Sequence, residues 1–384
     1  MKIMHLSTGH EGGAGIAARS LSKGLSKHGI TSHFYSLKNS KYFPEENEFY
    51  LNRGIEKILG SSFTFLNSKY SKRVFFSLFS ADSISFHKEL FNDYDIIHIH
   101  NWYNLISISS LDLLMRIEKP VVFTLHDERL LTGGCHYTLK CRKFETNCFA
   151  CPELPLGLNL VPFFQYNRLQ HKLQNSIFKI FISPSSWLIS EFKKISSMRE
   201  KEIVKIPNYL DFDAMSDSDK MPDISLNKGG LRRIGIASVH PYSYIKGGNF
   251  LKRLETYLTQ NKIPLKLFYL SDFFGKRSNV QNFWNNIDAL LVPSVLDNAP
   301  NVIFEAKYFG KPVIGSNTGG IPEIIDKEVD MLIDFENQSI ENICNQIINF
   351  NPFKIDLLKS RNYLLDMNGT SINLHLGIYK KILN

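Results

Sequence analysis

Residues 288–325 read DALLVPSVLDNAPNVIFEAKYFGKPVIGSNTGGIPEII, and this stretch decides the fold of the second half of the chain. The continuous apolar run Ala289–Val292 is typical of a strand that is buried on both faces. Residues 298–300, Asn-Ala-Pro, predict the start of a helix, because proline is tolerated in a first helical turn. Gly310 predicts the end of that helix.

The same strand-turn-helix pattern then repeats. Residues 312–315, Pro-Val-Ile-Gly, predict a second buried strand, and residues 318–320, Thr-Gly-Gly, lead into a short helix at Pro322. Both helices would begin at the carboxyl edge of a parallel sheet, where open α/β sheets bind ligands. Glycine-exposed amides at a helix start bind phosphate well. The stretch therefore predicts an α/β fold with a ligand site at this edge.

Two carboxylates stand out in this stretch. Asp297 precedes the first helix, and Glu305 lies about two turns later among apolar neighbours. A carboxylate on so apolar a helix must find partners or point into a cleft. The alternative is an ordinary surface glutamate on a half-buried helix.

Several short motifs follow one another in this stretch: Pro-Ser, an acidic residue, Asn-x-Pro-Asn-Val, Glu-Ala, Gly-x-Pro-Val and Gly-Gly-Ile-Pro-Glu. Together they strongly resemble the donor site of family 4 glycosyltransferases. The resemblance implies a GT-B fold, with two Rossmann-like domains facing across a cleft. It also implies transfer from a nucleotide-sugar donor with retention of anomeric configuration. By the same resemblance Glu305 binds the donor ribose and Asp297 contacts the transferred sugar, although the family usually has Glu at that position. The other expected donor-binding residues here are Asn298, Asn301, Thr318, Gly319 and Gly320.

A cationic clamp for the donor pyrophosphate is also implied by the resemblance. The family commonly has an Arg shortly after the glycine of the strand predicted at 233–239, but this chain has Ser238 in that region. Lys246 keeps the lysine turn, so we expect it to be the main phosphate contact and a catalytic residue. The alternative is a lysine that merely starts a solvated helix. With Lys246 and helix amides supplying positive charge, we expect no cofactor to be required for catalysis.

The amino-terminal half begins with a predicted strand at 2–7, a glycine loop and a helix from about Ile16. In the family this loop lies near the donor phosphate and sugar, which makes Gly12, Gly13 and Gly15 candidate donor-binding residues. A short glycine loop alone is a weak signal.

Histidines mark two further predicted strands, at 95–100 and 120–127. His98 and His100 share one strand face, and we favour a packing or cleft-wall role for them over a metal site. His126 and Asp127 lie at the carboxyl end of the next strand, where such sheets present their chemistry. The resemblance assigns His126 to the donor sugar, and we expect both residues to be catalytic.

Four of the five cysteines fall within 17 residues, with the spacing C-x5-C-x6-C-x2-C. Clustered thiols in a reducing compartment favour a structural zinc over disulfides. Buried thiols without a metal are the alternative. A similar Thr-Gly-Gly-Cys-His-Tyr run with trailing cysteines occurs in the exopolysaccharide branch of the family, which resembles colanic-acid-type transferases. The four cysteines are Cys135, Cys141, Cys148 and Cys151.

The net charge of +8 is carried mainly by residues 1–185. A basic amino-terminal half fits an anionic membrane or a lipid pyrophosphate, and no nucleic-acid motif is present, so we expect no nucleic-acid partner. Within residues 50–80, basic Lys69, Lys72 and Arg73 interleave with aromatics. This predicts either contact with an anionic membrane or a helical insert that packs its aromatics on its own domain.

We therefore predict an acceptor-binding domain at 1–190 and a nucleotide-sugar-binding domain at 205–368, with a helix at 370–384 that packs back on the first. The Asp-x-Asp triplets at 211–213 and 217–219 lie in an acid-rich linker, and we give them no metal role. No signal peptide or membrane span is evident, which predicts a cytoplasmic enzyme acting on a glycan or lipid-linked glycan acceptor. Another GT-B nucleotide-sugar enzyme, such as an epimerase or phosphorylase, and a non-catalytic binding subunit remain alternatives.

Overall fold

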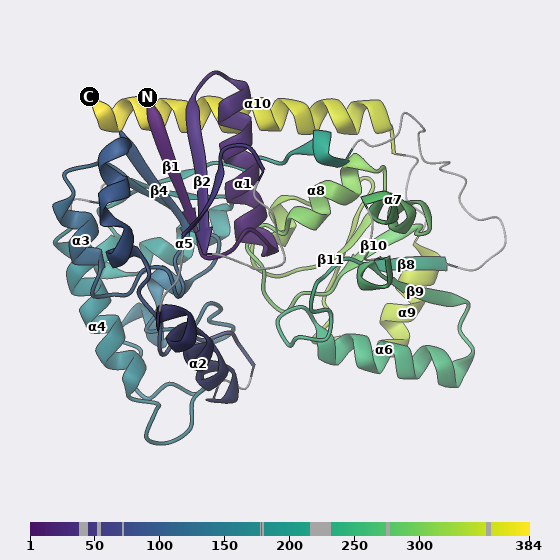
Figure 1. Ribbon diagram of the computed structural model, residues 1–384. Helices are drawn as coiled ribbons and strands as arrows, with labels where there is room; N and C mark the ends of the chain where they lie inside the picture. Colours follow the sequence, from purple (N-terminus) through teal and green to yellow (C-terminus); the bar gives the residue numbers. More distant parts are fainter. Residues whose placement is uncertain are drawn as a thin grey trace. The chain divides into compact units, whose positions relative to one another are not determined.

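Two units make up the part of the chain that the computed structural model describes (Figure 1). The first comprises Met1–Leu210 with Asn368–Asn384, and the second comprises Asp211–Met367. The described residues are 1–37, 45–51, 55–70, 73–176, 178, 180–215, 232–273, 277–350 and 355–384. The triplet at 217–219 and Lys72 lie outside these residues.

The first unit is built on a seven-stranded, all-parallel sheet with the order β3-β2-β1-β4-β5-β6-β7. Its strands are β1 (Lys2–Ser7), β2 (Thr31–Leu37), β3 (Glu48–Leu51), β4 (Ile96–Asn101), β5 (Val121–Thr124), β6 (Ile180–Ser183) and β7 (Glu202–Lys205). Its helices are α1 (Gly12–Lys27), α2 (Ile55–Tyr70), α3 (Leu111–Arg116), α4 (Val161–Gln174), α5 (Ser186–Lys193) and the last part of α10 (Leu357–Leu383). Because β7 pairs with β6, the first unit extends beyond the expected boundary at residue 190.

Alternating side chains of these strands fill two apolar cores, one on each side of the sheet. Ile3 and Ile96 pack with α1 and the end of α10, whereas Met4 and Ile97 pack with α3, α4 and α5. Burial on both faces explains why the strands are continuous apolar runs in the sequence. The segment Asn368–Asn384 contributes Tyr379, which is fully buried, to the α1 side.

The second unit has a five-stranded, all-parallel sheet with the order β12-β11-β10-β8-β9. Helices α6 and α9 pack on one face, and α7 and α8 pack on the other. Its strands are β8 (Arg232–Ile236), β9 (Leu265–Tyr269), β10 (Ala289–Val292), β11 (Val313–Ser316) and β12 (Met331–Ile333). Its helices are α6 (Gly248–Asn261), α7 (Arg277–Asn285), α8 (Asn301–Tyr308), α9 (Ile340–Asn349) and the first part of α10.

Three helix starts differ from the sequence prediction. Helix α1 begins at Gly12 rather than near Ile16, so the expected glycine loop forms the first turns of the helix. Gly15 is required there, because a Cβ would lie 2.4 Å from the carbonyl oxygen of Gly9. Pro300 is the residue before α8 rather than part of its first turn, and α10 begins earlier than the expected residue 370.

Among the described residues, no helix is both long and apolar enough to cross a membrane.

Candidate active site

In the second unit, Asp297 lies after β10 and pairs with a lysine 51 residues away in the sequence. The Nζ atom of Lys246 donates to Oδ2 of Asp297 at 2.6 Å. The Asp297 carboxylate also accepts from the Asn298 amide at 3.0 Å, and Ser294 Oγ lies 3.4 Å from it. The Asp297 side chain is 11% exposed and that of Lys246 is 34% exposed. The carboxylate is thus held inside, while the cation remains within reach of a ligand.

Glycine turns bring the loops around this ion pair into close contact. Gly247 adopts a φ of +81°, and a Cβ there would lie 2.2 Å from the carbonyl oxygen of Pro293. Gly319 adopts a φ of +58°, and a Cβ there would lie 2.1 Å from the carbonyl oxygen of Asp297. Only glycine fits both the backbone angle and the space. The loops after β8, β10 and β11 therefore meet at one place on the carboxyl edge of the sheet.

The turn at 318–320 is fixed by its own hydrogen bonds. Thr318 Oγ1 donates to the Ser294 carbonyl at 3.1 Å, and the Gly320 amide donates to the Asp297 carbonyl at 3.0 Å. The Ile321 amide bonds to the Thr318 carbonyl, so the amides of Gly320 and Ile321 are used within the protein. The expected short helix is a 3-10 turn, Ile321–Glu323.

Asn301 and Glu305 lie one turn apart on α8, and therefore on the same helix face. Asn301 is buried and Glu305 is half-buried. Burial raises the pKa of Glu305 to about 7. A ligand that donates hydrogen bonds to the Glu305 carboxylate would stabilise its charged form and lower its pKa.

In the first unit, His126 and Asp127 follow the end of β5, as the sequence predicts. They line a small hollow with Asn101, Trp102 and Arg129. Burial lowers the pKa of His126 to about 4, so the ring is neutral near pH 7. Burial opposes ionisation of Asp127, but His136 holds the pKa of that carboxyl below its ordinary value.

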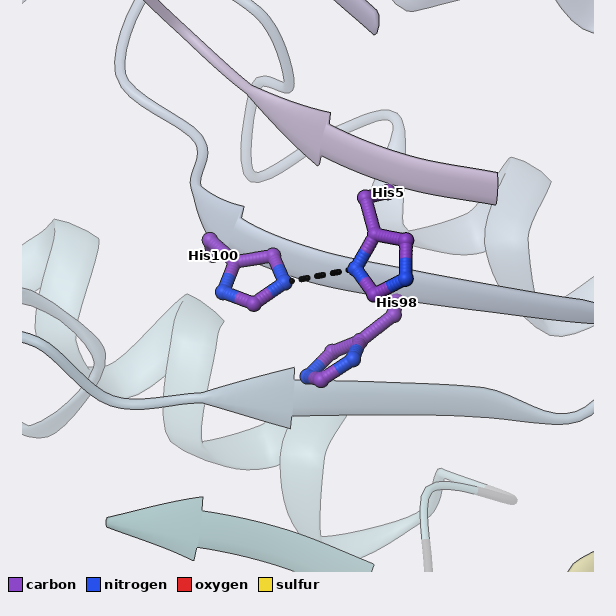
Figure 2. Close-up of side chains that lie close together, drawn as sticks. All are labelled: His5, His98 and His100. Atoms are coloured by element: carbon purple, nitrogen blue, oxygen red, sulfur yellow. Dashed lines mark hydrogen bonds between the residues drawn. The ribbon is translucent and has the colours of Figure 1, made fainter. Parts of the chain in front are cut away.

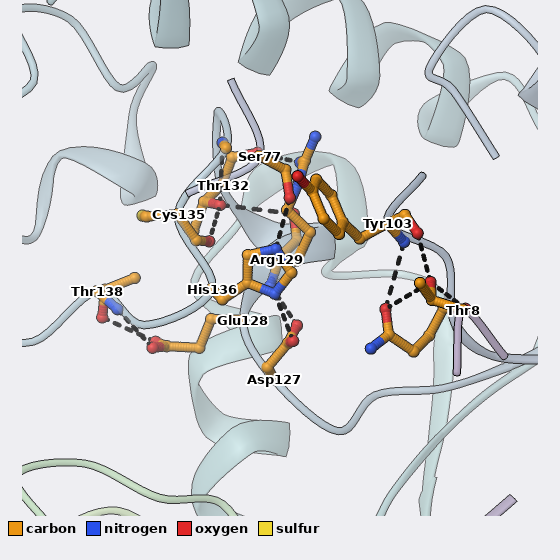
Figure 3. A network of polar contacts seen from close by, with 12 residues as sticks. Thr8, Ser77, Tyr103, Asp127, Glu128, Arg129, Thr132, Cys135, His136 and Thr138 are labelled. Carbon is orange, nitrogen blue, oxygen red and sulfur yellow. Dashed lines mark hydrogen bonds and ion pairs between the residues drawn. The ribbon is translucent and has the colours of Figure 1, made fainter. Parts of the chain in front are cut away.

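A residue that the sequence analysis missed, His136, orients Asp127 (Figure 3). His136 Nδ1 lies 2.7 Å from Asp127 Oδ2, and His136 Nε2 lies 2.6 Å from Ser77 Oγ. The order Ser-His-Asp resembles a hydrolytic triad, but Ser77 is only 2% exposed and cannot reach a substrate. The contacts instead fix Asp127 and tie the cysteine-containing segment to the chain near residue 77. The Thr-Gly-Gly-Cys-His-Tyr run was the available signal.

The two exposed glycines at the start of α1, Gly12 and Gly13, leave open space where a side chain would stand. Apart from the chain neighbours and the backbone of the helix itself, no atom of the described residues lies within 4 Å of a Cβ placed at either position. A ligand could therefore approach the backbone there, as the sequence suggests. Gly15, in contrast, serves the packing of the loop on the helix.

All four clustered cysteines are free thiols. The Gly133 amide donates to Sγ of Cys148 at 3.3 Å. Burial, together with the neighbouring Cys141 and Cys151, raises the pKa of Cys148 to about 12. The cysteines are thus neighbours, but among the described residues they do not form a group of three ligand atoms within 4.8 Å. The zinc hypothesis stays a prediction.

A group of potential ligand atoms that does lie within 4.8 Å is formed by His5, His98 and His100 (Figure 2). His98 and His100 do share a strand face, and their ring centroids are 4.1 Å apart. His5 was not singled out in the sequence, because only the pairing of β1 with β4 places it opposite His98.

The sequence matches the family described as Glycosyltransferase Family 4 over residues 11–214, more than half of the chain. The chain belongs to glycosyltransferase family 4. It also matches the family described as Glycosyl transferases group 1 over residues 255–350. This family 4 enzyme is therefore a glycosyltransferase, and its two parallel-sheet units are the Rossmann-like domains of a GT-B fold.

Two relatives are similar in sequence to this family 4 glycosyltransferase. The putative colanic acid biosynthesis glycosyl transferase WcaC of Escherichia coli K12 is 25% identical over 286 residues, which cover 66% of this chain and 68% of WcaC. An uncharacterized 41.2 kDa protein in the cps region of Klebsiella pneumoniae is 23% identical over 277 residues, covering 68% of this chain and 71% of that protein.

Solved structures share the fold at low sequence identity. Sucrose-phosphate synthase from Thermosynechococcus elongatus has a TM-score of 0.66 at 15% identity, covering 100% of this chain and 99% of that one. Anabaena Alr3699/HepE in complex with UDP and glucose has a TM-score of 0.56 at 16% identity, covering 99% of both chains. At such identity the likeness shows the GT-B fold alone.

Proposed function

We propose that this enzyme transfers a sugar, with retention of configuration, from a nucleotide-sugar donor to a growing lipid-linked surface polysaccharide, such as a capsule, exopolysaccharide or O-antigen. The observation that carries the proposal is the Lys246–Asp297 ion pair. It lies at the carboxyl edge of a parallel sheet, where glycine turns bring three loops together.

The donor is a nucleotide sugar because the site offers groups for each of its parts. Lys246 supplies a cation for the diphosphate, Glu305 supplies a carboxylate for the ribose hydroxyls, and Asp297 supplies a carboxylate for the sugar. Support comes from HepE, which has been solved with UDP and with UDP-glucose. Binding would draw the Lys246 ammonium from Asp297 toward the diphosphate and would free the Asp297 carboxylate for sugar hydroxyls.

Bond cleavage leaves negative charge on the departing diphosphate. A cation already at the site stabilises that charge without reorganising when the bond breaks. Retention follows from attack of the acceptor hydroxyl on the same face from which the diphosphate departs, within an ion-pair-like transition state, and the hydroxyl proton passes to an oxygen of the departing diphosphate. For the neutral His126 and the charged Asp127 of the first unit we keep the catalytic roles expected from the sequence.

A surface polysaccharide as product is supported by the two relatives, one named for colanic acid biosynthesis and one from a cps region. A lipid-linked acceptor is supported by α2, on which Ile58 and Phe65 are 68% and 66% exposed. Lys69, at the end of the same helix, is also exposed. Apolar side chains beside a basic residue suit contact with the cytoplasmic face of an anionic membrane.

The test is transfer from a panel of radiolabelled nucleotide sugars to lipid-linked glycan primers, with the linkage of the product determined by NMR. We expect one donor to give a product with the anomeric configuration of the donor. Lys252→Ala, which removes an exposed lysine of α6, is the matched control and should transfer at the wild-type rate. An inverted product would refute retention. Nucleotide binding without transfer to any primer would refute the proposed acceptor.

A further inference from the structure

Buried histidines on neighbouring strands form a continuous hydrogen-bonded chain that leads to His126. His5 Nδ1 lies 3.0 Å from His100 Nε2 (Figure 2), and His100 Nδ1 lies 3.2 Å from His126 Nε2. The chain runs from β1 through β4 to the residue after β5, because these strands are neighbours in the sheet. His5 and His100 are 0% and 6% exposed.

A metal ion is a poor explanation for this cluster. Both ring nitrogens of the third member, His98, already have partners at 2.7 Å, Tyr379 Oη and Thr124 Oγ1. No carboxylate appears among the charges that shift the pKa values of the three buried rings in the described part of the chain. A divalent cation there would be buried without a carboxylate counter-charge, which is costly.

The histidines of the chain are neutral, and neutrality restricts how their protons can be arranged. Burial lowers the pKa of His5 to about 3 and that of His126 to about 4, and it lowers the pKa of His100 well below its ordinary value. A neutral imidazole has one N–H and one lone pair. Each of the two N···N contacts needs one N–H and one lone pair. Because His100 takes part in both contacts, the two N–H groups must both point along the chain toward His126 or both toward His5.

Two observations select the direction toward His126. His5 Nε2 is buried and has no hydrogen-bond partner among the described residues. Orphaned buried N–H groups are rarer than under-satisfied acceptors, which favours a lone pair at His5 Nε2 and the proton at Nδ1. Asp127 carries a negative charge that acts on His126. When all N–H groups of the chain point toward His126, the positive end of their dipoles lies at His126, and the Asp127 charge stabilises that arrangement.

We propose that His5 and His100 are positioning residues that hold His126 as the tautomer protonated at Nδ1. His126 Nε2 is then committed as the acceptor from His100, and any hydrogen bond that His126 donates to a sugar or phosphate oxygen must come from Nδ1–H. The inference deepens the proposed function, on which its catalytic consequence rests. The tautomer itself is a property of the folded chain without substrate.

The direct test is long-range 1H–15N correlation NMR of the full chain labelled at its histidine nitrogens. The His126 signals are assigned by their loss in His126→Gln. We expect a protonated Nδ1 and an unprotonated Nε2 at pH 7. The opposite tautomer at His126 overturns the proposal whatever the enzyme transfers. Rapid exchange between the two forms in the wild type overturns it as well.

Substitution of His5 tests the role of the chain in catalysis. In His5→Asn the side-chain amide can replace the Nδ1 donor, whereas His5→Phe leaves His100 without one. We expect a mixture of His126 tautomers and a kcat lower by about tenfold or more in His5→Phe, with KM changed less, and recovery of both in His5→Asn. His171→Asn, which changes an exposed histidine of α4, is the control.

Three outcomes separate this inference from its rivals. If His5→Phe lowers kcat while the His126 tautomer stays fixed, His5 acts only through packing and the proposal fails. If metal analysis finds about one equivalent of a transition metal that His5→Phe loses, the rings are ligands and the proposal fails. If the wild type transfers no sugar but shows the expected tautomers, the proposed function fails and the tautomer assignment stands.

Discussion

Replacing Lys246 with alanine removes the cation of the proposed donor site and leaves Asp297 without its ion-pair partner. At 2.6 Å and an effective dielectric constant of about 20, the Coulomb energy of the pair is about 6 kcal/mol. Desolvation of the two charges offsets most of this energy. Because the Lys246 side chain is 34% exposed, we expect a net loss of roughly 1–3 kcal/mol in unfolding free energy.

The effect on catalysis should be larger than the effect on stability. Lys246 acts mainly on charge that develops as the diphosphate departs, so Lys246→Ala should lower kcat by about 100-fold or more and raise KM less. Steady-state transfer with the best donor measures both constants. Thermal unfolding measures the stability loss, at about 2–4 °C per kcal/mol for a domain of this size.

A double substitution separates the two effects. Lys246→Ala combined with Asp297→Asn no longer buries an unpaired charge, so the melting temperature should recover while kcat stays low. Lys246→Arg keeps the charge and should retain more activity than Lys246→Ala. A transfer rate for Lys246→Ala within about threefold of the wild type would show that another cation stabilises the leaving group, and the reasoning would be wrong.

Four further predictions follow, of which two concern pH, one concerns a metal and one concerns a membrane. Since the pKa of Glu305 is about 7 in the free protein, calorimetry should show nucleotide affinity rising as the pH increases through 7; an equal rise in Glu305→Gln would exclude this carboxylate. The same raised pKa predicts that Glu305 contributes its full stability below about pH 4.5 and that this contribution is lost as the pH rises through 7. In thermal melts, Glu305→Gln should therefore lack this decline of stability with pH. If residues 135–151 bind one structural zinc, metal analysis should find about one equivalent, and the clustered cysteines should react with a thiol reagent only after a chelator is added, whereas the buried Cys344 should stay unreactive in the folded protein; a stable, metal-free preparation with four free clustered thiols would end the hypothesis. Phe65→Ser should reduce co-sedimentation with anionic vesicles several-fold, whereas Tyr363→Ser, at a similarly exposed aromatic of α10, should not; equal loss in both would place the contact elsewhere.

Local sequence signals were enough to predict several of the strands and the resemblance to the family. Runs such as Ala289–Val292 are apolar throughout because both faces of a parallel strand are buried, and this holds wherever the strand lies in the sheet. Glycines at 247 and 319 are likewise read from the sequence as turns. Helix boundaries were predicted less well, and α1 begins four residues early because its first turn packs on Gly9.

What only the tertiary structure decided is which of the chemical groups touch one another. Lys246 and Asp297 were given separate roles from the sequence, but the fold joins them across 51 residues. His136 meets Ser77 across 59 residues, and His5 meets His100 across 95. The physical reason is that a parallel sheet brings strand ends distant in the sequence to one edge, and no local pattern records which strands are neighbours. Burial, which sets the charge state of Glu305 and of the buried histidines, is likewise a property of the packed chain.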